Sequence, residues 1–515
     1  MQSRGDSFKK RAARAAPRSS EALQEPPVTA AILYDLVQCP HRVSRDLRAD
    51  PIDRDEINPF IQLLWERGAL HEKETIERLN VPFLDLLAYA GDEKERLTYE
   101  AMDRREPLIY AGRIRADDLL GNPDLLRKEG EGYVAIDIKS GAGEEGTEDL
   151  SKPKKHYAVQ LAIYTDILER LGQSSGRHGY IWDINGQEFL YDLTAAQGPR
   201  KPESLWDEYQ SYLAVARAII ANTEQTLPAY GGVCKLCHWY TACVGAMQDA
   251  DDLTLIPELG RSRREPMLTE ISTIAELAAC DPEHYISGKK TDFRGIGADM
   301  LRKFHARARL LTDPNGRPYL KEAVTLPQGD MELFFDIEVD PIRDVCYLHG
   351  FVERRGGDNA TERYVAFFAE QPTAEAEEEA FAQAWRYIQE SDPAIIYYYS
   401  PYERTHWKKL RERYADVCTE EGIEAMFDKS RAVDLYNDVV RSRTEWPTRD
   451  HSIKTLAKYL GFNLRDTNPS GAASIEWFHR WVESGDPKIR QRILDYNEDD
   501  CRATRVLLDG IRALM

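Results

Sequence analysis

Three cysteines, Cys234, Cys237 and Cys243, fall within ten residues in the segment GGVCKLCHWYTACVG, and no other feature restricts the possible folds of this chain as strongly. The chain has only eight cysteines in 515 residues, and we expect no secretory signal. Clustered thiols are then better interpreted as metal ligands than as part of a disulfide framework. Three thiolates are one ligand short of a tetrahedral site, so the fold must bring a fourth ligand from elsewhere.

Length, charge and apolar runs exclude several classes of protein. The chain is too long for one hydrophobic core, and its length predicts three or four domains. No run of about 18 apolar residues occurs, so we expect no membrane partner. A net charge of −20 argues against a protein that coats nucleic acid by bulk attraction, but hydrolytic metal sites need carboxylates. We expect a cytoplasmic protein whose residues 1–28 form a disordered basic arm rather than an organellar transit peptide.

Changes of pattern divide the remaining chain into three parts. Residues 29–250 mix helical and strand-like periodicity and end on the cysteine cluster. Residues 251–325 start as a linker and continue as two helical patterns around Gly295-Ile296-Gly297, which resembles a helix-hairpin-helix. Residues 326–515 form a new domain that begins with the β-prone segment LPQGDMELFFDIEVD. A basic helix in the second part slightly favours nucleic-acid contact over a plain helical hairpin; it carries Arg302, Lys303, Arg307 and Arg309.

The first candidate site lies in residues 29–250. The segment GYVAIDIKSG alternates as a strand does, which places Asp137 and Lys139 on one face. A surface ion pair would explain these two residues if they stood alone. They are preceded by the strand-like run YAGRIRADDLLGN and followed by an amphipathic helix with Gln160 and Tyr164 four residues apart. Further upstream, the predicted helix WERGALHEKETIERL presents His71.

This order of elements resembles the RecB-like branch of the PD-(D/E)XK nucleases over about 200 residues. Asp118 is chosen over its neighbour Asp117 because strands of that family usually read Asp followed by two apolar residues. Oxygen and imidazole ligands suit Mg²⁺ or Mn²⁺. The resemblance implies that Asp118, Asp137 and His71 bind the cation, that Lys139 positions or activates the attacking water, and that Gln160 and Tyr164 shape the substrate side of the site.

The resemblance also supplies a fourth cysteine. Cysteine-rich members of this branch, the AddB-like and CRISPR-associated exonuclease groups, carry one cysteine before the nuclease core and three after it. Here Cys39 stands 195 residues before Cys234. The resemblance favours a 4Fe-4S cluster over zinc, although spacing alone does not separate them and His41 and His238 keep a mixed zinc site open. Either group would fasten the two ends of the domain together. We interpret the scattered Cys280, Cys346, Cys418 and Cys501 as small buried apolar residues.

The second candidate site lies in residues 326–515. The segment ELFFDIEVDP places Asp336 and Glu338 on one face of a strand whose other positions are apolar. Two like charges there imply a compensating cation, unless the strand is an exposed edge. The segment RILDYNEDDCRATRVLL predicts a helix with Tyr496 and Asp500 four residues apart, and AIIYYYSPYERTHWKKL predicts a buried strand leading to a helix that begins with Glu403.

This second set resembles the DnaQ-like 3′–5′ exonucleases of the RNase H superfamily over about 190 residues, with the YprB-like group nearest. The second acid departs from the family pattern, because Ser400 and Glu403 stand where Asn and Asp are usual. We interpret Asp434 as a structural residue at a strand end and as the fallback ligand. The resemblance implies that Asp336, Glu338, Glu403 and Asp500 bind two metal ions about 4 Å apart and that Tyr496 orients the nucleophilic water.

Together the two resemblances imply an α/β multidomain protein with a PD-(D/E)XK restriction-endonuclease-like core, a helical hairpin linker domain and an RNase H-like mixed-sheet domain. The expected function is hydrolysis of phosphodiester bonds in DNA, with RNA as the other candidate substrate, in DNA repair, recombination or defence. The alternatives are a nucleic-acid-binding or assembly module with inactive sites, and a subunit that works beside a helicase or recombination protein. Two complete sets of acids favour the enzyme, an exodeoxyribonuclease.

Overall fold

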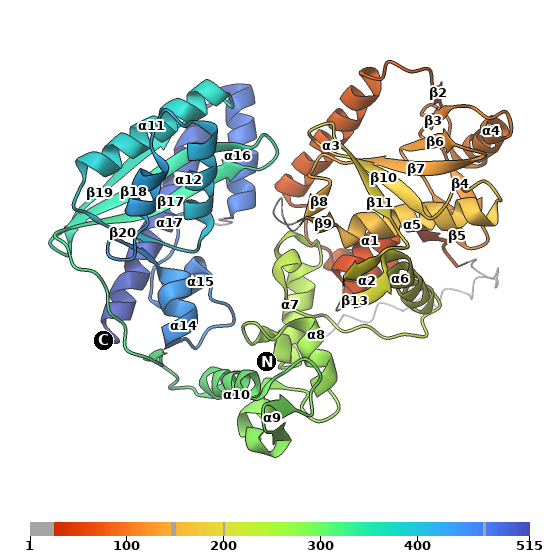
Figure 1. The fold of residues 1–515 in the computed structure, drawn as a ribbon. Coiled ribbons are helices and arrows are strands. Elements are labelled where there is room, and N and C mark those ends of the chain that lie inside the picture. The colour runs from red at the N-terminus through yellow and green to blue at the C-terminus, as the bar shows by residue number, and fades with distance from the viewer. Residues whose placement is uncertain (1–24, 146–150, 199–200, 467–469) are drawn as a thin grey trace, which may run out of the picture.

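The computed structural model describes residues 25–145, 151–198, 201–466 and 470–515. Figure 1 shows two mixed α/β domains beside each other, connected at the bottom of the view by a smaller, mainly helical part. The predicted basic arm at residues 1–28 lies outside the described residues up to residue 24. Within the described ranges, no helix is both long and apolar enough to cross a membrane.

The first domain is built on a six-stranded mixed sheet in the order β11-β10-β7-β6-β3-β2. Its central strand, β7, is buried at every position and pairs antiparallel with β6 and parallel with β10. Its strands are β2 (Leu84–Asp85), β3 (Leu108–Tyr110), β6 (Leu125–Glu129), β7 (Gly132–Ile138), β10 (His178–Trp182) and β11 (Glu188–Asp192).

Helix α5 (Lys155–Arg170) is the centre of the helical layer of this domain. Leu161, Ile163 and Ile167 of α5 are fully buried, and the helix packs against β7 and β10 and against α1 and α6. A separate sheet of three short strands lies beside it, in the order β1 (Val28–Thr29), β5 (Leu119–Gly121) and β4 (Ile114–Ala116). The remaining helices are α1 (Ala30–Gln38), α2 (Pro40–Arg48), α3 (Pro59–Glu77), α4 (Gly91–Asp103), α6 (Leu205–Ile220) and α7 (Tyr240–Asp249), and short strand pairs join β8 (Glu144–Glu145) to β9 (Lys152–Pro153) and β12 (Ala196–Gly198) to β13 (Lys201–Ser204).

The middle part has an apolar core of its own, which includes Leu253, Ile274 and Phe304. Its helices are α8 (Gly260–Arg264), α9 (Ile274–Ala279) and α10 (Ala298–Thr312), and α9 packs against α10. A 3₁₀ turn and a hairpin of β14 (Ile286–Ser287) and β15 (Lys290–Thr291) separate these two helices. Gly297 is the residue before α10 and not a direct joint between two helices, so the structure differs here from the expected helix-hairpin-helix.

The basic side chains of α10 form ion pairs within the chain. Arg307 is 1% exposed and donates to Glu445 Oε1 at 2.7 Å and to Pro257 O at 2.8 Å. Lys303 Nζ lies 2.7 Å from Glu258 Oε2, and Arg302 Nε lies 2.7 Å from Glu283 Oε1. These three cations therefore stabilise the middle part and its junction with the third domain. Their charges then give no reason to expect that this helix binds nucleic acid.

The third domain contains a five-stranded sheet in the order β19-β18-β17-β20-β21. The first three strands along the chain form an antiparallel meander, and β20 and β21 continue the sheet in parallel from β17. The strands are β17 (Met331–Asp340), β18 (Val345–Arg355), β19 (Asp358–Phe368), β20 (Ile395–Tyr398) and β21 (Ala432–Asp434), and the helices are α11 (Ala374–Glu390), α12 (Tyr402–Arg413), α13 (Glu420–Met426), α14 (Arg441–Arg443), α15 (Ile453–Tyr459), α16 (Gly471–Ser484) and α17 (Pro487–Arg512).

Separate apolar cores cover the two faces of this sheet. On one face Phe335 and Ile396 pack with Trp407 of α12. On the other face Phe334 and Tyr397 pack with Leu507 of α17. Burial on both faces explains why β17 and β20 are almost continuously apolar, and it makes the acidic residues of β17 exceptional.

The first and third domains also touch directly. Helix α3 packs against α16, and Arg67 Nη2 lies 2.8 Å from Glu483 Oε1 across this contact. The buried pair of Arg307 and Glu445 joins the middle part to the third domain. The two α/β domains are thus connected at two separate places, by α3 with α16 and through the middle part (Figure 1).

Candidate active sites

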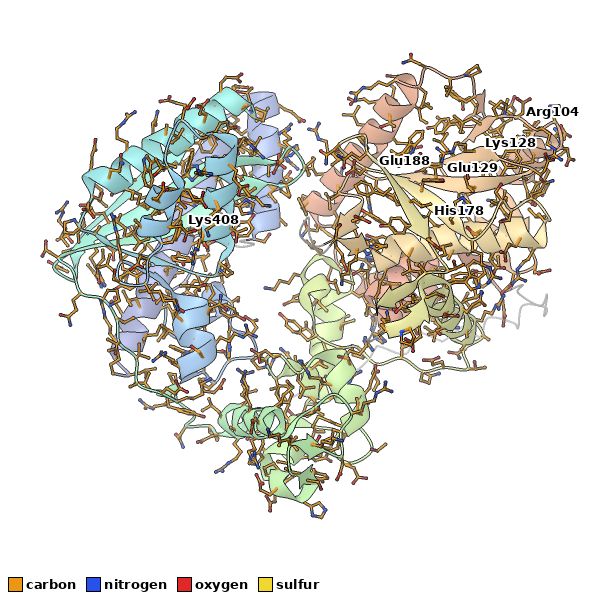
Figure 2. All side chains as sticks on the ribbon, in the orientation of Figure 1. Arg104, Lys128, Glu129, His178, Glu188 and Lys408 are labelled. Atoms are coloured by element: carbon orange, nitrogen blue, oxygen red, sulfur yellow. The ribbon has the colours of Figure 1, made fainter. Side chains whose placement is uncertain are left out.

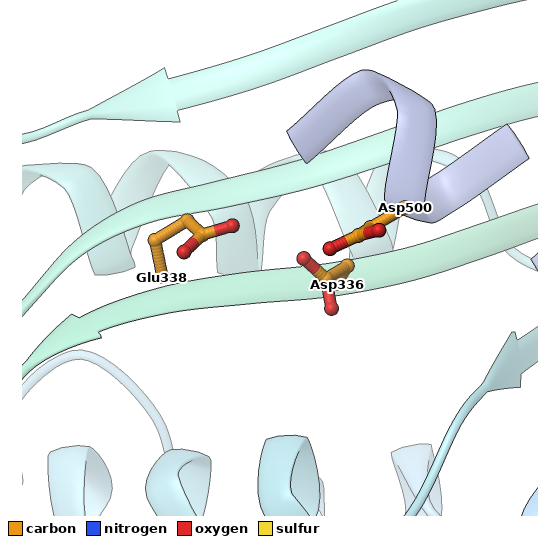
Figure 3. A group of neighbouring side chains, drawn as sticks. All are labelled: Asp336, Glu338 and Asp500. Atoms are coloured by element: carbon orange, nitrogen blue, oxygen red, sulfur yellow. The ribbon is translucent and has the colours of Figure 1, made fainter. Parts of the chain in front are cut away.

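Three acidic side chains converge in the third domain. Asp336 and Glu338 project from the same face of β17, and Asp500 reaches them from α17 (Figure 3). One carboxylate oxygen of each lies within 4.8 Å of the others, and no other trio of His, Cys, Asp or Glu among the described residues is gathered so closely. Glu338 and Asp500 are 5% and 8% exposed, so the group is shielded from solvent that would screen its repulsion.

Glu403 lies beside this trio. It occupies the first turn of α12, is 3% exposed, and its Oε2 atom has no hydrogen-bond partner among the residues described. Its charge acts on Asp336, which places it in the same electrostatic group. Asp434 has a different arrangement, since its carboxylate accepts hydrogen bonds from Ser400 N at 3.1 Å and from the Asn437 side chain at 2.8 Å. Those bonds fit the predicted role of Asp434 as a structural residue at a strand end.

Burial and mutual repulsion disfavour the ionised form of these acids. Burial, followed by the charges of Glu338, Asp500 and Glu403, raises the pKa of Asp336 well above its ordinary value. Burial and the charge of Asp500 raise the pKa of Glu338 to about 8. Asp500 Oδ1 is buried without a hydrogen-bond partner in the described part of the chain. Several hard oxygen donors with an unsatisfied oxygen fit one or more divalent cations such as Mg²⁺ or Mn²⁺.

A lysine and a tyrosine complete the group. Lys454 of α15 donates to Tyr496 Oη at 2.5 Å, and its Nζ atom lies 3.3 Å from Asp500 Oδ2. Burial and then the charge of Asp500 raise the pKa of Tyr496 well above its ordinary value, so the phenol stays protonated. Tyr496 is predicted from the sequence, whereas Lys454, in the segment SIKTLAKYLGF, is identified only by its contacts in the structure.

Asn497 is a second side chain that sequence reasoning missed. Its Nδ2 atom donates to Asp336 Oδ2 at 2.7 Å, and its Oδ1 atom accepts from Tyr364 Oη at 2.9 Å. Gly350 of β18 lies opposite Asp336, and a Cβ atom there would stand 1.6 Å from Asn497 Oδ1. Only glycine leaves room for this amide, which orients Asp336 from the side.

In the first domain, Asp137 and Lys139 meet as predicted. Asp137 is 2% exposed at the end of β7, and Lys139 Nζ lies 2.9 Å from its Oδ2 atom. Asp124 lies across the ladder, because the adjacent Leu125 pairs with Ile136, and its Oδ2 accepts from Ile138 N at 2.7 Å. Burial and then the charge of Asp137 raise the pKa of Asp124 well above its ordinary value. Burial opposes the charge on Lys139, but Asp137 and Asp124 together raise its pKa.

Asp118, the predicted partner of Asp137, is placed elsewhere. It lies in the turn between β4 and β5, in the small three-stranded sheet, and its carboxylate binds Arg217 Nε at 2.7 Å and Nη2 at 2.8 Å. Its neighbour Asp117 is bound by Arg170 in the same way, at 2.7 Å. Both are surface ion pairs. The structure therefore places Asp118 in a surface ion pair, and Asp124 is the acid that lies across the ladder from Asp137.

The other predicted residues of this site, Tyr164, Gln160 and His71, have different environments. Tyr164 is 4% exposed and packs against Gly121, and the charges of Asp137 and Asp124 act on it. Gln160 Oε1 and His71 Nε2 are buried without a hydrogen-bond partner in the described ranges. His71 lines a pocket of about 480 Å³ together with Trp182 and Asp183. The next residue on α3, Glu72, accepts from Tyr110 Oη at 2.9 Å, and its charge acts on Asp124.

The four predicted cysteine ligands come together. Cys39 begins α2, and it lines one small cavity of about 40 Å³ with Cys234, Cys237 and Cys243. Burial, with the neighbouring thiols, raises the pKa of Cys243 to about 12, and burial also raises the pKa of Cys234 and of Cys237. Neutral thiols at this density fit a site whose thiolates are formed when a metal binds.

The two histidines near this cavity are engaged elsewhere. His238 Nε2 lies 2.7 Å from Asp46 Oδ1, and His238 is not among the residues that line the cavity. His41 lines it, but its Nδ1 atom lies 2.9 Å from Thr226 Oγ1. A cation supplies the neighbouring charge instead, since Arg261 Nη2 lies 3.5 Å from Cys39 Sγ. Of the scattered cysteines, Cys346, Cys418 and Cys501 are buried as expected, while Cys280 is half-buried.

Two family models match the chain, and they match these two domains. Residues 30–244 match the model of the PD-(D/E)XK nuclease superfamily, and residues 333–511 match that of the RNase_H superfamily. No curated protein matches the chain. The first match spans Asp124, Asp137 and the four cysteines, and the second spans all four acids of the third domain. The expected fold class is confirmed: the chain contains a PD-(D/E)XK nuclease-superfamily domain followed by an RNase H-superfamily domain.

Proposed function

We propose that the protein is a metal-dependent nuclease that hydrolyses phosphodiester bonds of DNA at two active sites. The observation that carries this proposal is the buried trio of Asp336, Glu338 and Asp500, whose oxygens lie within 4.8 Å of one another. Buried carboxylates at this density repel one another unless cations join them. Two superfamily matches to nuclease-type domains support the same conclusion.

In the third domain, four acids would hold the divalent cations, Mg²⁺ or Mn²⁺. Bound cations supply charge stabilisation at the phosphoryl oxygens and lower the pKa of bound water. Asn497 fixes the orientation of Asp336. Lys454 holds the phenol of Tyr496 in place, and that phenol orients the attacking water. We assign this domain a 3′–5′ exonuclease activity of the DnaQ type. The four acids are Asp336, Glu338, Glu403 and Asp500.

In the first domain, Asp124 and Asp137 would hold the cation, with His71 as a further candidate ligand. Lys139 is positioned between the two carboxylates, where an ammonium can orient the attacking water and offset the charge of the phosphate. Gln160, whose buried Oε1 atom has no partner among the described residues, lies one turn before the buried Tyr164 on α5, which packs against β7. This arrangement supports the predicted substrate contacts.

The test is a nuclease assay on end-labelled single-stranded DNA, double-stranded DNA and RNA, with Mg²⁺ or Mn²⁺. Asp137→Ala, Asp336→Ala and the double variant are compared with Asp118→Ala, whose carboxylate is a surface ion pair and serves as the control. Each single variant should lose one cleavage activity, and the double variant should lose both. Absence of metal-dependent cleavage by the unmodified protein on all three substrates contradicts the proposal. If one single variant has no effect, that domain binds without cleaving.

We further propose that the four cysteines hold a 4Fe-4S cluster. A zinc ion bound by four thiolates at 2.3 Å would keep the sulfur atoms about 3.8 Å apart. No three of these thiols, all within the described residues, lie within 4.8 Å of one another. A cuboidal cluster, in which each cysteine binds a different iron atom, suits the wider spacing.

An anaerobic preparation should be brown and contain iron and sulfide, and Cys39→Ala should bleach it. A colourless preparation with stoichiometric zinc contradicts the cluster.

We propose that the protein acts in the processing of DNA in the cell. Cleavage of DNA at two different sites suits DNA repair, recombination or defence, beside a helicase or recombination protein that exposes single strands. Co-purification of such a motor protein with the tagged chain, lost when the lysate is treated with a nuclease, would indicate that only DNA links them.

A further inference from the structure

A cleft of about 650 Å³ lies where the three parts of the chain meet. Its first wall is the loop of the four-cysteine site, with Tyr230, Gly231, Gly232 and Lys235. Its second wall belongs to the third domain and includes Tyr399, Ser400, Tyr436, Arg449, His451 and Ile453. The middle part closes one side with Ile256, Glu258 and Gly260.

The cleft is lined by chain neighbours of the acid site of the third domain, although none of the acids of that site lines it. Ser400 lines the cleft and precedes the first turn of α12, which carries Glu403. Ile453 also lines the cleft and is followed directly by Lys454, the residue that contacts Tyr496 and Asp500. The cleft and the acid site are thus neighbours along the chain at two separate points.

Two exposed cations lie on opposite walls of the cleft. Lys235 and Arg449 are both exposed, and neither donates a hydrogen bond to, or forms an ion pair with, any residue that the structure describes. They differ from most basic side chains of this acidic chain, which are paired, as Arg302 and Lys303 are. Unpaired cations facing a cleft are available for phosphate groups.

The acids of the cleft have partners of their own, and the charge of Lys235 also acts on Asp450. Asp450 accepts hydrogen bonds from Ser452 N at 2.9 Å and from Ser452 Oγ at 2.6 Å. Glu258 lies 2.7 Å from Lys303, 3.5 Å from Arg307 and 3.6 Å from Arg441. His451 adds no fixed charge, since burial and the nearby cation Arg307 lower its pKa to about 4. Arg449 and Lys235 are the cleft cations that no carboxylate binds within 4 Å in the described part of the chain.

Aromatic rings line both walls between these cations. Tyr399 and Tyr436 are half-buried, with their ring centroids 5.5 Å apart. Tyr230 lies on the opposite wall, close enough to Asp450 for that charge to act on it. Beside it, a Cβ atom at Gly231 or Gly232 would meet no atom within 4 Å, so packing inside the protein does not require glycine there. Aromatic rings between exposed cations, with a low backbone wall, fit unstacked bases and their phosphates.

We infer that this cleft binds single-stranded nucleic acid and leads it to the acids of the third domain. Lys235 and Arg449 contact phosphates, and Tyr230 and Tyr436 stack with bases. The inference rests on the proposed nuclease function of that domain and adds to it one specific element: a loop of the first domain, fixed between Cys234 and Cys237, forms part of the substrate site of the other nuclease.

Binding is tested first without cleavage. Fluorescence anisotropy in EDTA, with labelled oligothymidylates of four to sixteen nucleotides, compares the unmodified chain with Lys235→Ala, Arg449→Ala and the double variant. The double variant should bind the longer oligomers about tenfold more weakly, and each substitution should reduce the slope of log K against log salt by about 0.7. Lys128→Ala is the matched control, because Lys128 lies on β6 at the outer side of the first domain (Figure 2). Unchanged affinity and slope in the double variant overturn the inference.

A second measurement separates this inference from the proposed function. The p-nitrophenyl ester of thymidine 5′-monophosphate needs only the acid site, whereas a long single strand also needs the cleft. Lys235→Ala with Arg449→Ala should lower kcat/KM on the long strand about tenfold and leave hydrolysis of the ester unchanged. Equal loss on both substrates, or on neither, overturns the cleft. No hydrolysis of the ester by the unmodified protein contradicts the nuclease assignment, while the anisotropy result still decides the cleft.

Discussion

Lys454 contacts two members of the acid site at once. It donates to Tyr496 and lies 3.3 Å from Asp500, so one ammonium positions the phenol and partly neutralises an acid. We predict that Lys454→Met lowers the kcat of the nuclease activity proposed for the third domain by about one to two orders of magnitude, because proton positioning at the water is lost. The KM for DNA should change little.

Two variants make this prediction specific. Lys454→Arg keeps a cation and should restore part of the activity and move its pH profile. Lys458→Met, on the same helix but exposed, should behave as the unmodified protein. Single-turnover cleavage across pH 6 to 9 measures each case, and a normal rate for Lys454→Met would exclude a positioning role.

Asp124 gives the residue-scale prediction for the first domain. It is buried beside Asp137, whereas Asp118 is held at the surface by Arg217. Asp124→Asn should reduce cleavage by this domain by about two orders of magnitude or more, since a carboxylate ligand of the proposed cation is lost. Asp118→Asn should leave the rate within about twofold. The assay uses the Asp336→Ala background, so that only the first site cuts. The reverse result would restore Asp118 as the ligand.

The sequence could locate this acid only to within a few residues. The pattern Asp-Leu-Leu occurs three times, at residues 85–87, 118–120 and 124–126. The last two copies stand shortly before the strand with Asp137, and both fit the rule that an acid precedes two apolar residues. The strand register decides between them, because Leu125 pairs with Ile136 and brings Asp124 to Asp137. Register depends on long-range pairing, which a local pattern does not encode. The preceding Pro123 was the available signal, since Pro-Asp is the literal start of the motif that names the superfamily.

At the scale of elements, β18 carries a buried histidine that makes stability depend on pH. His349 Nδ1 accepts from Trp407 Nε1 at 3.2 Å, and burial lowers the pKa of His349 from 6.5 to about 3. The unfolded chain therefore binds a proton below pH 6.5 that the folded chain does not bind. This contribution to stability is complete above about pH 7 and is lost as the pH falls toward 3.

The expected loss from this one residue is about 2 kcal/mol between pH 7 and pH 5. Urea unfolding at pH 7 and at pH 5 measures it, with tryptophan fluorescence as the probe. His349→Gln keeps an acceptor but cannot titrate, so its decrease over this range should be smaller by that amount. His178→Gln is the control variant, since His178 is half-exposed and lies on β10 beside Glu129 in the first domain (Figure 2). The same pH dependence in His349→Gln and the unmodified protein would contradict the assignment.

Element-scale prediction succeeded where burial and periodicity agree. The strand containing Asp137, the helix containing Gln160 and Tyr164, and β17 all occur as expected, because each has a long apolar pattern of one period. The middle part differs from expectation because Gly295-Ile296-Gly297 is typical of several turns. The cations of α10 were equally ambiguous, since sequence does not show that Glu258, Glu283 and Glu445 would meet them.

For the whole molecule, the pair of Arg307 and Glu445 decides how firmly the third domain is attached. Both side chains are at most 2% exposed, and Arg307 also donates to Pro257 O. Arg307→Met leaves Glu445 buried with the half-exposed Lys321 as its remaining cation within 4 Å among the described residues. We expect this change to destabilise the junction by about 3 kcal/mol.

Hydrogen exchange measures this effect, because it reports the opening of the junction separately from global unfolding. Amides of α10 and of β22 (Thr444–Glu445) should exchange faster in Arg307→Met, while those of β7 stay protected. Arg309→Met is the matched control, because Arg309 is exposed on the same helix. Equal exchange in both variants would show that the ion pair does not hold the domains.

The order of the two nuclease-type domains could be predicted from the sequence, since each carries its own set of acids in one stretch of chain. The joint construction of the cleft could not. Lys235 and Arg449 are more than 200 residues apart in the sequence, and only the packing of three separate cores places them on opposite walls. Sites that lie between domains have no local pattern in either domain.

The acid trio of the third domain affects the stability of the protein before a cation binds. Asp336, Glu338 and Asp500 oppose folding as long as they are charged and no cation is bound between them. The folded chain without cations is therefore less stable than the cation-bound chain. Asp336→Asn should therefore melt at a higher temperature than the unmodified chain in EDTA and at a lower or equal one in Mg²⁺, as a thermal shift assay would show. In a cell with few divalent cations, this protein would have its lowest stability and would be most susceptible to proteolysis.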